Sequence, residues 1–143
     1  MRDTQRSQIV SPKLREIAKQ AQDDPSLVFT SLAHLIDASF LAEAYHRTKR
    51  SSATGVDKVS WKEYGRELAV NLKHLHTRLK SGRYRAPLIR RVWLEKDDKK
   101  KRPIGIPTLE DKVVQRAVSM IFHMVFVQNA VHINPLSIFE SSV

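Results

Sequence analysis

The first fifty residues carry apolar side chains at helical spacing in three successive stretches. Ser11-Pro12 is typical of a helix start, with serine as the N-cap, and predicts an amphipathic helix of about ten residues. Asp24-Pro25 repeats this signal, and Asp37 is a candidate N-cap for a third helix. The expected buried residues are Leu14, Ile17, Ala18 and Ala21; Leu27, Val28, Leu32 and Leu35; and Phe40, Leu41, Ala44 and Tyr45. The pattern therefore predicts a helical N-terminal extension over residues 1–50.

The next stretch combines a loop with one long helix. Residues 51–59 (SSATGVDKV) are small and polar around Gly55 and have no period, which predicts a loop. Ser60 and Glu63 match a capping box, and Gly82 supplies a C-terminal stop. The apolar stripe between them consists of Trp61, Tyr64, Leu68, Leu72, Leu75 and Leu79. A continuous amphipathic helix is expected, with Trp61 in its core face.

Beyond Pro87 the pattern becomes extended. Residues 88–94 and 102–107 are rich in β-branched and apolar side chains and flank a fully charged segment at 95–101, which predicts a β-hairpin. Pro103 and Pro107 each lack a backbone donor and confine the second strand to an edge. Thr108 with Asp111 predicts the start of a last helix, whose buried side would hold Val113, Val114, Ala117, Met120, Ile121 and Met124. The expected fold class is α+β.

Composition and charge narrow the possible functions. The 143 residues suit one modest domain or a piece of a larger one, and the absence of cysteine excludes a disulfide scaffold, a cysteine-based zinc finger and a thiol enzyme. The net charge is +10. Residues 51–120 hold 17 lysines and arginines against 8 acidic residues, a net charge of +9, whereas residues 1–50 carry +2 and residues 121–143 carry −1. This local excess favours a polyanionic partner.

Neither a leader nor a membrane span is expected. The first eight residues are polar, and the longest apolar stretch, residues 117–127, is broken by Ser119 and His123 and is too short to cross a bilayer. The sequence therefore predicts a cytoplasmic protein without membrane contact.

The residues alone indicate no catalytic centre. His74 and His76 are two apart on a helix and face different directions, and the adjacent aspartates at 23–24 and 97–98 are better explained by capping and solvation. No phosphate-binding loop and no dinucleotide fingerprint occurs. We therefore predict no catalytic residue and no metal ligand.

The hairpin is instead a candidate binding surface. Its turn and second strand present Lys96, Lys99, Lys100, Lys101 and Arg102 to phosphates. Trp93 and Tyr84 could stack either on bases or on neighbouring side chains. A solvated hairpin tip with core aromatic residues is the alternative.

Several motifs resemble one family. T-G-V-D at 54–57, Trp61, G-x-Y-x-x-P at 82–87, R-R-V at 90–92 and K-R-P-I-G-I-P-T-L-E-D-K-V-V-Q at 101–115 occur in this order. They resemble the amino-terminal part of bacterial group II intron reverse transcriptase/maturases. The resemblance extends over residues 36–121, with a weaker match over residues 11–35, and implies the fingers subdomain of a right-hand polymerase, an RNA-directed DNA polymerase.

The resemblance also implies roles for individual residues. Thr54 and Gly55 would lie near the template, Arg90 and Arg91 toward the template path, and Ile106 and Pro107 toward the templating base. Lys96 and Arg102 would meet the triphosphate of the incoming nucleotide, because a guanidinium and an ammonium suit its charge. The remaining hairpin cations, Lys99, Lys100 and Lys101, are expected to contact RNA.

Intron RNA is the expected partner, with a DNA primer or template in the full-length family. Residues 51–121 are predicted to be the fingers-like segment and 122–143 a divergent tail, with the palm, thumb and maturase domains absent. The family's magnesium carboxylates have no counterpart here, so no cofactor and no polymerase activity are expected of this chain alone. A stand-alone basic RNA-binding module and the product of a degenerate reading frame are the alternatives. The oligomeric state is left open.

Overall fold

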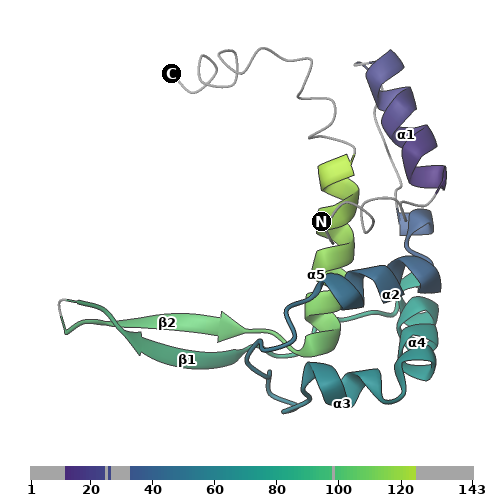
Figure 1. Cartoon of the computed structure of the whole chain (residues 1–143). Helices are drawn as coiled ribbons and strands as arrows, with labels where there is room; N and C mark the ends of the chain where they lie inside the picture. The colour runs from purple at the N-terminus through teal and green to yellow at the C-terminus, as the bar shows by residue number, and fades with distance from the viewer. Residues whose placement is uncertain (1–11, 25, 27–32, 98, 125–143) are drawn as a thin grey trace, which may run out of the picture. The chain divides into compact units, whose positions relative to one another are not determined.

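The computed structural model describes residues 12–24, 26, 33–97 and 99–124 (Figure 1). The chain divides into two compact units, one formed by residues 1–35 with 118–143 and the other by residues 36–117. The second unit contains the hairpin and most of the motifs. The predicted tail lies almost entirely outside the described residues.

The first unit holds helix α1 (Pro12–Asp23), which begins at the predicted proline. Ala18 and Ala21 of its predicted apolar face are buried, at 3% and 6% exposure. The helix predicted after Pro25 lies mostly outside the described residues; at its far end Ala33–Leu35 forms a short 3-10 turn, η2, with Leu35 buried.

Helix α2 (Ala38–Arg47) opens the second unit and confirms the third predicted helix. The Asp37 carboxylate accepts a hydrogen bond from the backbone N–H of Phe40 at 2.8 Å, so the predicted cap is formed. All four predicted apolar residues of α2 are buried, and the helix packs against α4.

The single helix predicted from residue 60 to residue 82 is wrong, because it is broken into α3 (Trp61–Gly65) and α4 (Leu68–Lys80). Gly65 lies so close to the Tyr45 hydroxyl that a Cβ would overlap it. Glu67 then leaves the helical region at φ −122° and ψ 41°. The Asn71 amide donates to the Tyr64 carbonyl at 3.0 Å and satisfies an acceptor at the break.

Tyr45 and Trp61 fasten α2 to α3. Their rings stack at 4.5 Å with an interplanar angle of 11°. The Tyr45 hydroxyl donates to the Trp61 carbonyl at 2.7 Å, and the Trp61 indole N–H donates to the Tyr45 carbonyl at 3.1 Å. The Arg50 guanidinium carbon lies 4.8 Å from the Trp61 ring centroid. The predicted packing role of Trp61 is thus confirmed, although its main partner is an aromatic ring.

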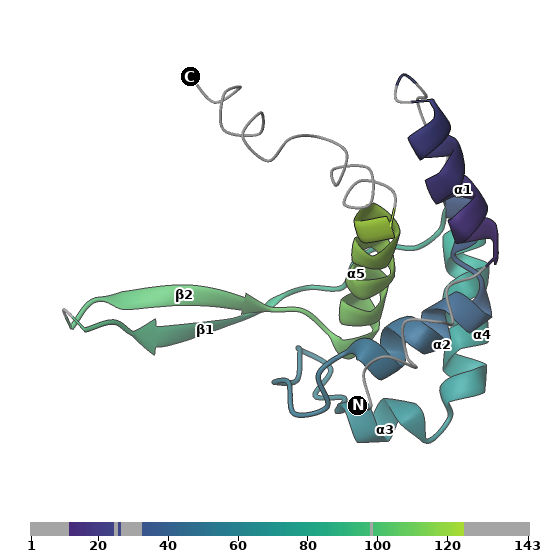
Figure 2. The same ribbon diagram turned by 45° about the horizontal axis from the view of Figure 1, so that its top comes forward.

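The predicted hairpin is confirmed as an antiparallel pair of strands, β1 (Arg90–Glu95) and β2 (Lys101–Ile106). Gly82 adopts φ +69° just beyond α4, as expected of a C-terminal stop. Within the second unit the hairpin extends away from helices α2, α3 and α4 (Figures 1 and 2).

Helix α5 (Leu109–Phe122) follows β2 and is capped as predicted, because the Asp111 N–H donates to the Thr108 hydroxyl at 3.3 Å. Val113 and Ala117 are buried in the second unit, together with Leu109, which the pattern did not indicate. Ile121 is buried at 4% exposure, whereas Val114, Met120 and Met124 are only half-buried. The helices and the two-stranded sheet confirm the α+β class.

Candidate nucleic-acid interface

The T-G-V-D loop lies directly on the backbone that joins β2 to α5. Gly55 is buried, and a Cβ added to it would stand 2.6 Å from the Thr108 Cα, 2.7 Å from the Thr108 nitrogen and 2.9 Å from the Pro107 carbonyl carbon. Only a residue without a side chain allows this approach. The loop is therefore fixed against the segment formed by Ile106, Pro107 and Thr108.

Two cations hold the residues before Gly55. The Arg90 Nε donates to the Thr54 carbonyl at 2.9 Å. The Lys112 ammonium donates to the Ser52 hydroxyl at 3.1 Å and to the Ala53 carbonyl. Partial burial, and then the nearby positive charge of Arg90, lower the pKa of Lys112.

We call this arrangement the junction and define it by Thr54, Gly55, Arg90, Pro107, Thr108 and Lys112. It brings together four residues that the resemblance places at the template: Thr54, Gly55, Arg90 and Pro107. Ile106 is close by, because it is the cross-strand partner of Arg90. Lys112 was not a predicted site residue, although it lies within the long motif.

The alternation of side chains along β1 separates Arg90 from Arg91. Directly paired residues share a face of an antiparallel sheet, and successive residues alternate between faces. One face, which we call the inner face, therefore carries Arg90, Val92, Leu94, Arg102, Ile104 and Ile106. The other, the outer face, carries Arg91, Trp93, Glu95, Lys101, Pro103 and Gly105. The two adjacent arginines thus point to opposite sides.

The hairpin tip is a tight turn in which lysines flank the acidic pair at positions 97 and 98 of the sequence. The Lys96 N–H donates to the Lys100 carbonyl at 2.8 Å, and the Lys99 N–H donates to the Lys96 carbonyl at 3.0 Å, with Lys99 at φ 60°. Lys96, Lys99, Lys100, Lys101 and Arg102 are all exposed. None of these five forms an ion pair with another described residue. Their charges are therefore available to a polyanion.

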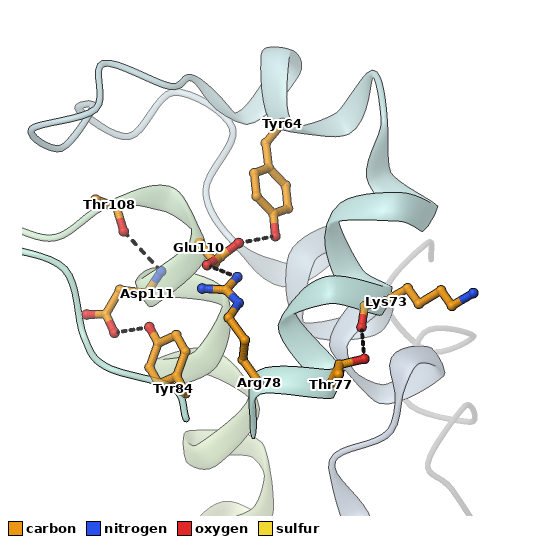
Figure 3. Close-up of polar contacts among 8 residues, drawn as sticks. All are labelled: Tyr64, Lys73, Thr77, Arg78, Tyr84, Thr108, Glu110 and Asp111. Carbon is orange, nitrogen blue, oxygen red and sulfur yellow. Dashed lines mark hydrogen bonds and ion pairs between the residues drawn. The ribbon is translucent and has the colours of Figure 1, made fainter. Parts of the chain in front are cut away.

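The start of α5 also carries a polar network that the sequence did not indicate (Figure 3). Glu110 accepts from the Tyr64 hydroxyl at 3.1 Å and from an Arg78 guanidinium nitrogen at 2.5 Å. Asp111, 7% exposed, accepts from the Tyr84 hydroxyl at 2.8 Å and from the Gln115 amide at 2.7 Å. The network ties the segment that leads into the hairpin to α5.

Tyr84 is therefore engaged by neighbouring side chains, the second of its two predicted alternatives. Its hydroxyl is bound to Asp111, and the Arg78 guanidinium carbon lies 5.8 Å from its ring centroid. Burial raises the pKa of Tyr84 well above its usual range, and the hydrogen bond to Asp111 adds to the effect. Burial likewise raises the pKa of Tyr64, with the Glu110 charge as the next cause. Both phenols remain donors throughout the physiological pH range.

These two tyrosines predict a loss of stability in alkali. Their pKa in the folded chain exceeds the ordinary value of 10.0, so the unfolded chain loses protons first as the pH rises. The stability that they contribute is complete below pH 10 and is expected to fall progressively above it. Urea denaturation between pH 8 and pH 11 measures this fall, which should be shallower in Tyr84→Phe and in Tyr64→Phe. Equal slopes in the parent and both variants would contradict the assignment.

Helix α4 adds a second basic surface. It contains no acidic residue, and an open cavity of about 440 Å³ is lined by Lys73, His74, Thr77 and Arg78. In Figure 3 the Lys73 side chain points away from the Glu110 network. None of these four residues belongs to the junction.

The described residues hold no metal-binding cluster. In the part of the chain that the structure describes, no three histidine, aspartate or glutamate side chains gather as ligands. Among the same residues, no helix is both long and apolar enough to cross a membrane.

The hairpin and the T-G-V-D loop of this basic α+β segment contain the motifs that resemble those of group II intron reverse transcriptase/maturases. No family model matches the chain. It is 31% identical to the group II intron-encoded protein LtrA of Lactococcus lactis subsp. cremoris over 118 aligned residues. The aligned region covers 79% of this chain and 19% of LtrA. It is also 41% identical to protein YkfC of Escherichia coli (strain K12) over 116 aligned residues, which make up 78% of this chain and 30% of YkfC.

These similarities support the predicted reverse transcriptase/maturase relationship. The chain spans less than a third of the length of either relative.

Proposed function

We propose that this chain is the fingers segment of a group II intron-encoded reverse transcriptase/maturase and that it binds RNA through the hairpin and the junction. The observation that carries the proposal is the bond between Arg90 and the Thr54 carbonyl, which joins the T-G-V-D loop to the root of the hairpin. The similarity to LtrA over most of the chain supports the family. The template strand would run along the junction.

The inner face of the hairpin suits an incoming nucleotide. The Lys96–Lys100 hydrogen bond adds one more cross-strand pair beyond Glu95 and Lys101. Because side chains alternate between the two faces, both lysines lie on the same face as Arg102. Their charges match a triphosphate, whereas Ile104 and Ile106 nearer the root offer apolar contact. Lys96 and Arg102 would hold the triphosphate on this face. We also propose that this chain alone has no polymerase activity, and a primer-extension assay tests this.

RNA affinity should depend on the hairpin cations more than on net charge. In a variant with Arg91, Lys100 and Lys101 all changed to glutamine, we expect affinity for a structured intron RNA to fall about 10- to 100-fold at moderate salt. Each lost phosphate contact should also reduce the slope of log K against log salt by about 0.7 to 0.9. Fluorescence anisotropy at several salt concentrations measures both quantities.

The matched control removes the same charge from α3, α4 and the turn between them, through glutamine at Lys62, Arg66 and Lys80, which are exposed. Its effect should be several-fold smaller. Equal losses of RNA affinity in the two triple variants would mean that the affinity depends only on the net charge of the chain. An unmodified chain that binds no RNA would refute the proposed function itself.

A further inference from the structure

Trp93 is the most prominent apolar feature of the outer face. It is 56% exposed, although a tryptophan carries one of the largest apolar surfaces of any side chain. It lies midway along a hairpin that extends from the helices into solvent (Figure 2). In contrast to Trp61, which packs on Tyr45, it makes no aromatic contact with another described residue.

The strand pairing places a proline beside this indole. Because Lys96 and Lys100 form a hydrogen-bonded pair, Trp93 and Pro103, three pairs away, form a non-hydrogen-bonded pair. Side chains approach more closely at such positions, and the N–H that proline lacks would point outward from the hairpin. Trp93 and Pro103 thus form a small apolar platform without loss of a ladder hydrogen bond.

The surroundings limit the size of this platform. Toward the root, Gly105 has no side chain, and the Ile89 Cγ2 occupies the space 2.7 Å from where a Cβ would stand. Toward the tip, Glu95 lies opposite Lys101. The apolar area therefore consists of one indole, one proline ring and the side chain of Ile89, which is 59% exposed. This small area suits a single planar ring better than a large apolar protein surface.

The charges around the platform favour a nucleotide. Arg91 lies two residues from Trp93 on the same face, and Lys101 lies two residues from Pro103. Glu95, the partner of Lys101 across the strands, offsets one of these charges and leaves the outer face with a net positive charge. Beyond Lys101 the tip adds the exposed Lys99. An aromatic surface flanked by cations along a strand is the arrangement that binds single-stranded nucleic acid, in which bases stack and phosphates meet the cations.

We propose that the outer face binds an unpaired nucleotide of RNA, with its base stacked on Trp93 and its flanking phosphates held by Arg91 and Lys101. This inference rests on the proposed RNA-binding function and specifies its ligand. A base inside a duplex has both faces covered by its neighbours and cannot stack on the indole. The outer face therefore selects single-stranded over double-stranded RNA.

The test compares a 15-nucleotide single-stranded RNA with a 15-base-pair RNA duplex, each titrated against the full chain. Trp93→Ala should weaken binding of the single strand about 5- to 150-fold and leave the duplex nearly unchanged. Trp93→Phe should retain most of the affinity, and Trp93→Leu should not, because leucine is apolar but cannot stack. An unchanged melting temperature verifies that each variant folds.

The outcomes separate the two proposals. Binding of the single strand that survives Trp93→Ala, or that Trp93→Leu preserves, overturns the stacking site but leaves RNA binding intact. A parent chain that binds neither RNA overturns both proposals. A parent chain that self-associates, with Trp93→Ala abolishing the association, would assign the outer face to a second copy.

Discussion

Gly55→Ala is expected to lower the free energy of unfolding by about 3 kcal/mol, a large effect for one methyl group. The new Cβ would meet the Thr108 Cα at 2.6 Å and the Thr108 nitrogen at 2.7 Å. Both are backbone atoms, so no rotamer change can relieve the overlap, and either the loop or the start of α5 must move. Urea denaturation, with circular dichroism as the signal, measures the loss.

Two other glycines serve as matched controls. Gly82 has φ +69° and no atom within 4 Å of an added Cβ, so Gly82→Ala should cost only about 1 kcal/mol through backbone strain. Gly105→Ala meets only the Ile89 side chain, which can rotate. A Gly55→Ala chain no less stable than Gly82→Ala would disprove the close approach between the T-G-V-D loop and Thr108.

Local signals predicted most of the elements because the interactions behind them are local. The caps at Asp37, Ser60 and Thr108 each accept a hydrogen bond from the backbone N–H three residues on. Gly82 ends α4 through its own backbone conformation. The hairpin follows from a charged turn between two apolar runs. Such features depend on a few neighbouring residues and can be recognised in one sequence.

The errors and omissions involve residues far apart in the chain. The break after Gly65 depends on Tyr45, twenty residues earlier, and the apolar stripe continues across the break without any change of period. Arg78 and Glu110 meet across 32 residues, so nothing beside either one signals the pair.

The candidate site was predictable in part. The resemblance named Thr54, Gly55 and Arg90, which the structure brings together at the junction. It assigned Arg90 and Arg91 together to the template path, although adjacent residues of a strand point to opposite faces. Which face each arginine shares with the second strand depends on the register. The exposure of Trp93 likewise follows from how the hairpin leaves the helices, which its own sequence does not determine.

Asp111→Ala is the second large expected effect, again about 3 kcal/mol of unfolding free energy. The carboxylate is 7% exposed and accepts hydrogen bonds from Tyr84 and Gln115. Its removal leaves both donors without this partner and also takes a negative charge from the first turn of α5, where the helix dipole favours one. Asp111→Asn should cost less, because the amide oxygen still accepts from Tyr84 while its NH₂ opposes the Gln115 amide.

A double-mutant cycle with Tyr84→Phe isolates the bond between the two residues. If the hydroxyl acts through Asp111, the two single losses should exceed the double loss by about 1 kcal/mol. Additive losses would mean that Tyr84 stabilises the chain only by packing.

The same variants test whether this network also affects RNA binding. Tyr84 lies between α4 and β1 in the chain, and its hydroxyl is bound to Asp111 of α5. Loss of this bond should therefore let the root of the hairpin move relative to α5. RNA affinity should then fall in Asp111→Ala under conditions where the chain is still folded, even though Asp111 itself is buried.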